Sequence, residues 1–423
     1  MKILVLHNRY RPTAPSGENV VVDQESAALA ARGHEVVLEQ RHSDEIASWS
    51  GVRRATLPLR VLWSETSRRS LAASLVEHQP DVVHVHNLFP LLTPSVLRAC
   101  RDAGVPVVAS IHNYKLGCAN GELFRDGHVC HDCLGRTPLP GVAHGCYRSS
   151  AVATAPVALG SVLHARAWRT MVSAYAFLSA AQRDLLAPLG LPADRSFVKG
   201  NFVPSSSAAD APATQHQVAF VARLDEAKGT RLVMQAWDAL RARRPGSALR
   251  LVVAGSGSMT EEVGRWADGH PSVRFAGRLA RDEVTSLMAS SRAVLAPSEW
   301  EETFGMVAIE AMAAGTAPVA SAHGAFPELI TPGSDGALFT PHDASALSAV
   351  LDDVDDHPAR WDACGRSAHQ TYLARFSPEV GIARLEEIYA FAVAHPACSD
   401  TGTAGRSGLA PDLVGLGAGP EGA

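Results

Sequence analysis

Apolar and polar positions along the chain repeat one pattern twice. In the first half, short runs that are apolar throughout alternate with longer amphipathic segments, beginning with KILVLH and SGENVVVDQESAALAARG. The apolar runs predicted as strands are residues 2–7, 34–40, 81–86, 105–112, 174–180 and 196–202. A helix is also predicted over residues 93–103, with Thr93 as its N-cap. Continuous apolar strands interleaved with helices are typical of a parallel sheet that is covered on both faces.

The pattern starts again after a Ser, Ala and Pro rich stretch at residues 204–216, which is interpreted as a linker. The strands predicted in the second half are residues 217–223, 249–255, 273–277, 292–298 and 317–321. Each is followed by a helical segment. The chain is therefore predicted to be an α/β protein with two doubly wound, Rossmann-like domains, and ligands of such proteins bind in the cleft between the domains.

Four parts of the chain follow from this pattern. Residues 1–200 form the predicted N-terminal domain and residues 201–375 the predicted C-terminal domain. Residues 376–395 are predicted to be a helix that packs back on the first domain. The tail, residues 396–423, is rich in Gly, Ala and Ser without periodicity, so disorder is expected there.

Composition narrows the class of protein. The chain has 423 residues, of which 46% are hydrophobic and 19% charged, and its net charge of -5 gives no reason to expect a nucleic-acid partner. The N-terminal apolar run is too short for a signal peptide, and residues 151–163 fall short of the roughly 20 residues that span a bilayer. A cytoplasmic protein is expected, in which cysteines are thiols or metal ligands more often than disulfides.

Residues 299–315, EWEETFGMVAIEAMAAG, place Glu302 and Glu310 on either side of Phe304 and Gly305. A strand is predicted just before this segment and a helix within it, so the turn lies at the carboxyl edge of the sheet. Free backbone N–H groups at a helix start can bind an anionic or hydroxyl-bearing ligand, and Gly305 would let that ligand approach closely. Each carboxylate suits a pair of sugar hydroxyls. The alternative is that Glu302 caps the helix and Glu310 faces solvent.

Two further turns of the second half have chemistry that suits an anion. Arg223 follows a strand and Lys228 starts the next helix, which makes a plausible pair of cations for a diphosphate. Gly255 and Gly257 form a tight turn between a strand and a helix. Taken alone, each of these turns could also be an ordinary solvated connection between a strand and a helix. No Walker sequence and no GxGxxG is present, which disfavours an NTPase or a dinucleotide enzyme.

These elements, in this order, resemble the retaining glycosyltransferases of family 4, which have the GT-B fold. The resemblance rests on Glu302 and Glu310, on Arg223 with Lys228 and Gly229, and on SGENVVV, DVVHVHN and SIHN in the first half. It spans roughly residues 1–395. It implies transfer of a hexose-type sugar from a UDP- or GDP-linked donor to a hydroxyl group.

The resemblance also implies roles for single residues. Arg223 and Lys228 would hold the donor diphosphate, in place of a catalytic metal ion. Glu310 would bind the ribose. Glu302 and the backbone amides of Phe304 and Gly305 would bind the donor sugar, with His112 at the reaction centre.

The first domain is expected to supply the acceptor side. Ser16, Gly17 and Glu18 form a loop that would face the cleft, where Gly17 permits close approach to the donor and Glu18 could orient the acceptor. Asn113 follows His112 and is placed on the acceptor side as well. His84 is interpreted as an ordinary hydrogen-bonding residue of the core.

A cysteine-rich insertion follows at residues 115–150. A central CxxC with one further cysteine on each side could bind zinc through the four thiolates of Cys118, Cys130, Cys133 and Cys146. Such a structural site would help to order a segment with little apolar surface. Free thiols and disulfides remain the alternatives.

The acceptor stays open between a polysaccharide, a lipid-linked molecule and a small natural product. Residues 53–75 are basic with interleaved apolar residues, which suits either a solvated helix or a helix on a membrane surface at the inner face of the membrane. Two other functions fit the same fold, a nucleotide-sugar 2-epimerase and a non-catalytic module that binds a sugar nucleotide. The two glutamates favour the transferase over the epimerase, and Arg223, Lys228 and Glu310 argue against a module without turnover.

Overall fold

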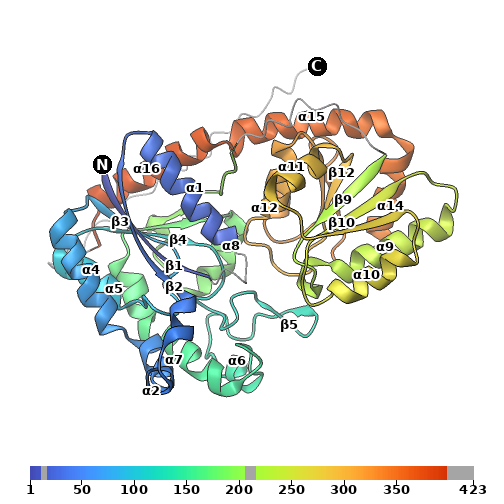
Figure 1. The fold of residues 1–423 in the computed structure, drawn as a ribbon. Helices are drawn as coiled ribbons and strands as arrows, with labels where there is room; N and C mark the ends of the chain where they lie inside the picture. Colours follow the sequence, from blue (N-terminus) through green and yellow to red (C-terminus); the bar gives the residue numbers. More distant parts are fainter. Residues whose placement is uncertain (11–16, 205–215, 398–423) are drawn as a thin grey trace.

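The computed structural model describes residues 1–10, 17–204 and 216–397. Two α/β units lie side by side, each with a parallel sheet between helices (Figure 1). The predicted architecture of two doubly wound domains is confirmed. Ser16, most of the predicted linker and nearly all of the predicted tail lie outside the described residues.

The first sheet has six parallel strands in the order β2–β1–β3–β4–β7–β8. Its strands are β1 (Lys2–Arg9), β2 (Glu35–His42), β3 (Val82–Val85), β4 (Val107–Ile111), β7 (Ala174–Phe177) and β8 (Ser196–Val198). The central strands are buried along their whole length, as their continuous apolar sequences predict.

Successive residues of β1 enter opposite faces of this sheet. Leu4 and Leu6 pack into the cluster formed with α4 (Glu65–His78), α5 (Ser95–Ala103) and α7 (Ala151–Met171). Ile3 and Val5 pack into the cluster formed with α1 (Gly17–Ala31) and α16 (Pro378–Ala394). Alternate residues of β1 therefore pack into two separate cores, one on each face of the sheet.

The second sheet also has six parallel strands, in the order β11–β10–β9–β12–β13–β14. They are β9 (Gln217–Val221), β10 (Arg250–Ala254), β11 (Val273–Gly277), β12 (Ala293–Ala296), β13 (Ala317–Ser321) and β14 (Ala337–Phe339). Its helices are α9 (Thr230–Arg243), α10 (Thr260–Asp268), α11 (Arg281–Ala289), α12 (Met306–Ala313), α13 (Phe326–Leu329), α14 (Ala344–Asp356) and α15 (Pro358–Arg375). The sequence pattern did not predict β14, whose three residues are too few to form a distinct apolar run.

Both strand orders reverse direction once. In the first sheet the reversal lies between β1 and β3, and in the second it lies between β9 and β12. Ligands of open parallel sheets bind outside the carboxyl ends of the strands at such a point. The turns that follow β1, β9 and β12 are therefore the segments to inspect for a site.

The last helix returns to the first domain. α15 runs along the second domain, and α16 continues over the first (Figure 1). On α16, Ile382, Leu385 and Ile388 are completely or almost completely buried against the first sheet and α1. The Tyr389 hydroxyl lies 2.8 Å from Nδ1 of His84. The core of the first domain thus includes residues from the far end of the chain.

Two predicted helix ends can be compared with the structure. α5 begins at Ser95 with Pro94 as N-cap, so the prediction of Thr93 as the N-cap is wrong. Thr93 instead adopts a positive φ of 59°, and its hydroxyl lies 2.8 Å from that of Ser95. The end of α12 follows the prediction, because Gly315, with φ 76°, comes directly after its C-cap.

The remaining short elements lie around the first sheet. They include a 3-10 helix (Ser43–Ser48), α2 (Gly51–Ala55), α3 (Leu57–Leu62), the hairpin of β5 (Phe124–Arg125) with β6 (His128–Val129), α6 (Leu139–Ala143) and α8 (Ala180–Leu186). Within the described residues, no helix combines the length and apolar character needed to cross a membrane.

Candidate functional site

A cleft of about 410 Å³ lies between the two domains. The first domain contributes Gly17, Glu18, Val21, His112, Leu178 and Asn201 to its lining. The second domain contributes the ends of β9 and β12, Lys228, and the loop and helix start from Ser298 to Glu310. The predicted residues Gly17, Glu18, His112, Lys228, Glu302, Phe304, Gly305 and Glu310 thus line one cleft.

Lys228 and Glu302 form an ion pair in the wall of this cleft. The Ser298 hydroxyl donates a 2.7 Å hydrogen bond to the same Glu302 oxygen, and the Lys228 ammonium lies 4.7 Å from the centre of the Trp300 ring. Burial alone would raise the pKa of Glu302, but the Lys228 charge and these hydrogen bonds outweigh it and lower that pKa. Glu302 is therefore an anion that fixes the position of Lys228.

Glu310 lies on α12, eight residues beyond Glu302, and is half-buried in the same cleft. Desolvation raises its pKa to about 7, and the charge of Arg281 opposes that rise. A carboxyl group without a close cation can exchange its lost water contacts for hydroxyl groups of a ligand. Glu302 and Glu310 are therefore not equivalent, because Glu302 is already paired and Glu310 is not neutralised by any described ion pair.

Gly305 is the N-cap of α12 and has φ 88°. A Cβ at this position would lie 2.4 Å from the Phe326 ring, so Phe326 fills the space beside the glycine. This packing and its left-handed backbone both require the glycine. Gly305 also lines the cleft, so its predicted close approach to a ligand stays a prediction. Phe304 is buried in the same cluster, 2% exposed.

Gly255 and Gly257 have a similar explanation. Their added Cβ atoms would lie 1.9 Å from the carbonyl oxygen of Ala222 and 2.3 Å from that of Leu224. The two glycines thus let the turn after β10 approach the turn after β9. Neither residue is among the described residues that line the cleft.

Arg223 also stands outside the lining of the cleft in this structure. Its guanidinium pairs with Asp225 and, at 3.2 Å, with Glu122 of the cysteine-rich insertion. Arg223 and Glu122 come from different domains and are both partly exposed. The predicted pair of cations is therefore separated here, with Lys228 in the cleft and Arg223 held by the insertion.

The domains also touch at the base of the cleft. The Thr303 hydroxyl donates a 3.1 Å hydrogen bond to the carbonyl of His112, and the Ser179 hydroxyl donates a 2.9 Å bond to the carbonyl of Thr303. The Glu328 carboxylate accepts a 2.8 Å bond from the backbone N–H of Ala180, at the start of α8.

His112 lines both the cleft and a second hollow in the first domain. Its Nε2 lies 2.8 Å from Nδ1 of His86, and the two rings stack. Burial lowers the pKa of both imidazoles far below the ordinary value, and for His112 the charge of Lys199 adds to this effect. Both are neutral at neutral pH.

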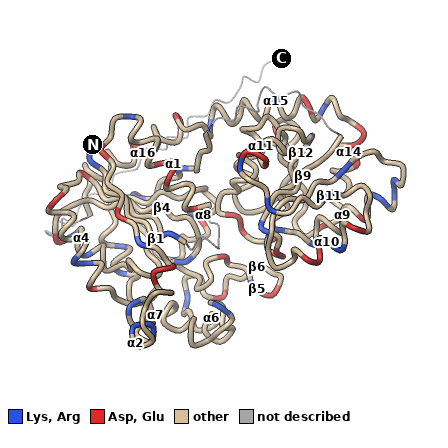
Figure 2. The backbone as a smooth tube through the Cα atoms, in the orientation of Figure 1, with Lys and Arg blue, Asp and Glu red and all other residues tan. Residues whose placement is uncertain are grey.

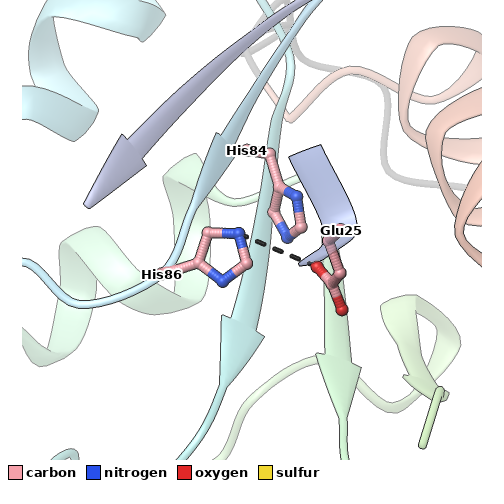
Figure 3. A group of neighbouring side chains, drawn as sticks. All are labelled: Glu25, His84 and His86. Carbon is pink, nitrogen blue, oxygen red and sulfur yellow. Dashed lines mark ion pairs between the residues drawn. The ribbon is translucent and has the colours of Figure 1, made fainter. Parts of the chain in front are cut away.

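Behind His86 lies a buried group of charged and aromatic residues. Lys199 and Glu25, each 2% exposed, form an ion pair, and the other Glu25 oxygen is 3.9 Å from Nε2 of His86 (Figure 3). His84 lies beside them with Nε2 2.9 Å from the Ser110 hydroxyl. Sequence reasoning placed His84 in the core but did not anticipate this network.

Glu25, His84 and His86 bring three ligand atoms within 4.8 Å of one another, which a metal site would require. Both nitrogens of His84 and one of His86 already have hydrogen-bond partners. The Lys199 ammonium supplies the positive charge beside Glu25. The group is therefore interpreted as a buried support for His112, with Lys199 balancing the charge of Glu25, rather than a cation site.

The second hollow lies in the first domain and has a volume of about 460 Å³. His112, Asn113, Glu18 and Lys115 lie on its lining, together with residues of α3, α7 and the insertion. Burial raises the pKa of Glu18 to about 7, against the hydrogen bond of Tyr10 and the charge of Lys115. Glu18 and His112 each line both the cleft and this hollow, so the two spaces meet at these side chains.

The four predicted cysteines line one small hollow of about 20 Å³. The structure shows no disulfide among these four residues, and desolvation raises the pKa of Cys133 and Cys146. The Cys118 thiol bonds to Asn120 and the Cys133 sulfur accepts from the backbone N–H of Gly141. Among the described residues, the group that has three ligand atoms within 4.8 Å of one another is the histidine group above, not the cysteines.

The sequence analysis missed three residues of the cleft and hollow. Trp300 lies against Lys228, and Asn201 is 4% exposed with an unpartnered side-chain oxygen in the cleft. Lys115 lies 4.5 Å from the centre of the Phe89 ring, and both residues line the second hollow. A signal existed for Trp300, since an aromatic residue between glutamates is unusual in a turn, but none marked Asn201.

Two family models match the chain, and together they cover most of it. Residues 15–206 match the model described as Glycosyltransferase Family 4, and residues 205–371 match the model described as Glycosyl transferases group 1. The boundary between the two matches falls between the two sheets.

Curated relatives are similar in sequence. A glycogen synthase of Mycobacterium tuberculosis is 26% identical over 439 aligned positions, covering 92% of this chain and 94% of the relative. A phosphatidyl-myo-inositol mannosyltransferase of Mycolicibacterium smegmatis is 33% identical, over 45% of this chain and 50% of its own length.

Solved structures are similar in fold. Alr3699/HepE of Anabaena, solved in complex with UDP, has a TM-score of 0.65 and 17% identity, covering 92% of this chain and all of its own. A sucrose-phosphate synthase of Thermosynechococcus elongatus has a TM-score of 0.66 and 18% identity, covering 93% of this chain and 99% of its own. The sheets, the cleft and both family matches agree: the chain is a glycosyltransferase that belongs to family 4 and has the GT-B fold.

Proposed function

We propose that this enzyme moves a hexose-type sugar from a UDP- or GDP-linked donor to a hydroxyl group of an acceptor, with retention of configuration. The observation that carries the proposal is that two hollows meet at His112 and Glu18. The cleft has the chemistry for a nucleotide sugar. The hollow in the first domain, here called the acceptor hollow, can hold an acceptor.

The donor would lie along the second domain. Lys228 offers an ammonium group to the diphosphate, and backbone N–H groups at the start of α12 add a partial positive charge. Glu310 would accept hydrogen bonds from the ribose hydroxyls. The UDP bound by the Anabaena neighbour and the names of the glycogen synthase and mannosyltransferase relatives support a nucleotide-sugar donor.

Arg223 would join Lys228 when the donor arrives. Its partner Glu122 is a single, partly exposed carboxylate, whereas a diphosphate carries at least two negative charges and can bind a guanidinium through two oxygens. Diphosphate would therefore displace Glu122. Two cations then stabilise the negative charge of the departing nucleotide, which is the role a metal ion has in other transferases.

In the reaction, the bond from the anomeric carbon to the phosphate oxygen breaks and its electrons go to the nucleotide diphosphate. The acceptor oxygen forms the new bond on the same face, and its proton goes to the departing phosphate oxygen. Neutral His112 would hydrogen-bond the donor sugar, and Glu18 would orient the acceptor hydroxyl beside it.

Release of UDP or GDP from a panel of nucleotide sugars, in the presence of EDTA, tests the donor side. We expect turnover of at least one hexose donor, and no release with any nucleotide sugar would overturn the proposal. Acceptor panels of oligosaccharides, lipid-linked sugars and small phenols or polyols follow with the preferred donor. NMR of the anomeric proton in the product decides retention, since an inverted product contradicts that part.

A further inference from the structure

Exposed apolar side chains are concentrated at one end of the first domain. Fifteen large hydrophobic residues are exposed among the described residues, and eight of them belong to residues 52–63 and 139–163. These eight are Val52, Leu59, Trp63, Leu139, Val152, Leu159, Val162 and Leu163. Single exposed apolar residues are normal, but a cluster of this kind marks an interaction site.

The elements that hold these residues are packed on one another. α3 lies on α7 where Gly160 faces the side chain of Leu62, and Nε2 of His164 lies 2.6 Å from the carbonyl oxygen of Leu62. The Trp63 ring stacks on that of His164. Figure 1 shows α2, α6 and α7 together at this end of the molecule. We call the surface of α2, α3, α6 and α7 the apolar arginine face.

Its charges are of one sign. Residues 133–171 contain no Asp or Glu and four arginines, and residues 46–64 contain no Asp or Glu and three arginines. Figure 2 shows Lys or Arg positions around α2, α6 and α7. Glu65, the first acid beyond this stretch, is already paired with Arg68 and Arg69. The whole chain has a net charge of -5, so the excess of positive charge is a local property of this face.

The arginines lie close to aromatic rings. The guanidinium of Arg53 lies 4.2 Å from the centre of the Trp49 ring, and that of Arg60 lies 5.6 Å from it. The face thus combines exposed apolar side chains with arginines and has no negative charge among them. Such a surface can place its apolar side chains among the acyl chains of an anionic bilayer and its arginines among the headgroups.

The acceptor hollow reaches this face. Val61 of α3 and Val157, Val162 and Arg169 of α7 line the hollow, and Val162 is also one of the exposed residues of the face. A molecule anchored in a membrane under α3 and α7 could therefore extend its polar end toward His112 without leaving the bilayer.

We propose that the apolar arginine face docks on an anionic membrane surface and presents the acceptor hollow to a lipid-linked acceptor. The membrane docking is inferred from the apolar arginine face alone, whereas the lipid-linked acceptor rests on the proposed function. A second copy of this chain is a poorer occupant, because a two-fold interface would place these arginines opposite one another.

Flotation with vesicles of phosphatidylglycerol and phosphatidylcholine tests the docking without any transfer assay. The full chain is expected to float with vesicles that contain phosphatidylglycerol, and not with pure phosphatidylcholine. Exchanging three exposed residues outside the hollow, Val52→Ser with Leu59→Ser and Val152→Ser, should reduce bound protein at least about tenfold. The matched control is Val76→Ser with Leu373→Ser and Val393→Ser, which are exposed apolar residues elsewhere, and it should bind like wild type.

Other outcomes overturn the proposal. Equal loss in both triple variants would assign the binding to general surface hydrophobicity. A wild-type dimer in size-exclusion chromatography that the first triple variant breaks would assign the face to self-association. If vesicles bind and soluble sugars are the better acceptors, the docking stands and the lipid-linked acceptor is rejected. Failure of donor turnover in the nucleotide-sugar panel would leave the flotation result unaffected.

Discussion

Lys228 and Glu310 keep a charged or chargeable group in the cleft in different ways. Lys228 is balanced by Glu302, whereas Glu310 avoids the cost of an unpaired charge by a raised pKa. We expect Lys228→Ala and Glu310→Ala to lower kcat/KM for the donor by about 100-fold or more, because each removes a charged contact to it. Circular dichroism should be unchanged, and steady-state kinetics gives the measurement.

Arg231→Ala is the control for these variants, since Arg231 lies on α9 and pairs with Glu262 on the surface. It should keep nearly the activity of the wild type. Activity close to wild type in both cleft variants would contradict the donor site as assigned here.

The pKa of Glu310 also predicts a pH profile. Its pKa of about 7 in the folded protein lies above the ordinary value of 4.5 for a glutamate. The carboxylate therefore forms, and can accept two hydroxyl donors, as the pH rises through about 7. Donor kcat/KM should therefore rise from about pH 6 to about pH 8. In the free enzyme the same group contributes stability that is present below about pH 4.5 and is lost as the pH rises to about 7.

The Glu310→Gln variant separates this group from Glu18, whose pKa is also raised to about 7. We expect lower activity and a flatter profile, measured as kcat/KM against pH with a saturating acceptor. An unchanged rise in this variant would assign the titration to another group.

For single residues, the sequence predicted which side chains line the cleft better than it predicted the partners of those side chains. Glu302 and Lys228 were predicted from their positions between a strand and a helix, and Glu310 from its position in the helix that follows Glu302. The ion pair of Glu25 with Lys199 joins residues that are 174 positions apart, and no local pattern reports such a contact. The unpartnered oxygen of Asn201 depends on the packing around it and has no signature in the sequence.

Among the elements, the cysteine-rich insertion of the first domain contacts the second domain through the ion pair of Glu122 with Arg223. If donor diphosphate displaces Glu122, then Glu122→Gln should lower the donor KM about two- to fivefold, the range expected from a partly exposed ion pair. Asp126→Asn, at an exposed position of the same insertion, is the control. A higher donor KM in Glu122→Gln would mean that the pair positions Arg223 for binding.

The cysteines of the insertion carry a second prediction. If Cys118, Cys130, Cys133 and Cys146 bind zinc, the double variant Cys130→Ser with Cys133→Ser should lose it and lose acceptor affinity, while donor binding persists. Elemental analysis of freshly purified protein and calorimetric titration with UDP measure the two effects. Cys364→Ser in the second domain is the control, and wild type without stoichiometric metal would reject the zinc site.

The elements themselves were largely predictable. The apolar runs located eleven of the twelve strands of the two large sheets, because a strand buried on both faces has little choice of residues. The short β14, the hairpin of β5 with β6 and the true start of α5 were missed. In these places a few contacts with distant segments decide the backbone, and local preference does not.

For the whole molecule, α16 matters most to stability. Leu385 is completely buried between the first sheet and α1, so Leu385→Ala should lower the free energy of unfolding by about 2–5 kcal/mol. Urea denaturation followed by circular dichroism measures the change. Val380→Ala, at an exposed position of α16, is the control, and equal effects of the two variants would mean that α16 does not complete this core.

The return of α16 has a consequence for how the protein is made. The ribosome finishes the first sheet early, but one of the helices that covers its outer face is encoded nearly two hundred residues after β8. Until that helix emerges, Ile3, Val5 and their neighbours have an open apolar side. The nascent first domain therefore stays incomplete while the second domain, which lies between β8 and α16, is synthesised. The two domains can be separated by sequence, yet the first becomes complete only when the last helix is translated.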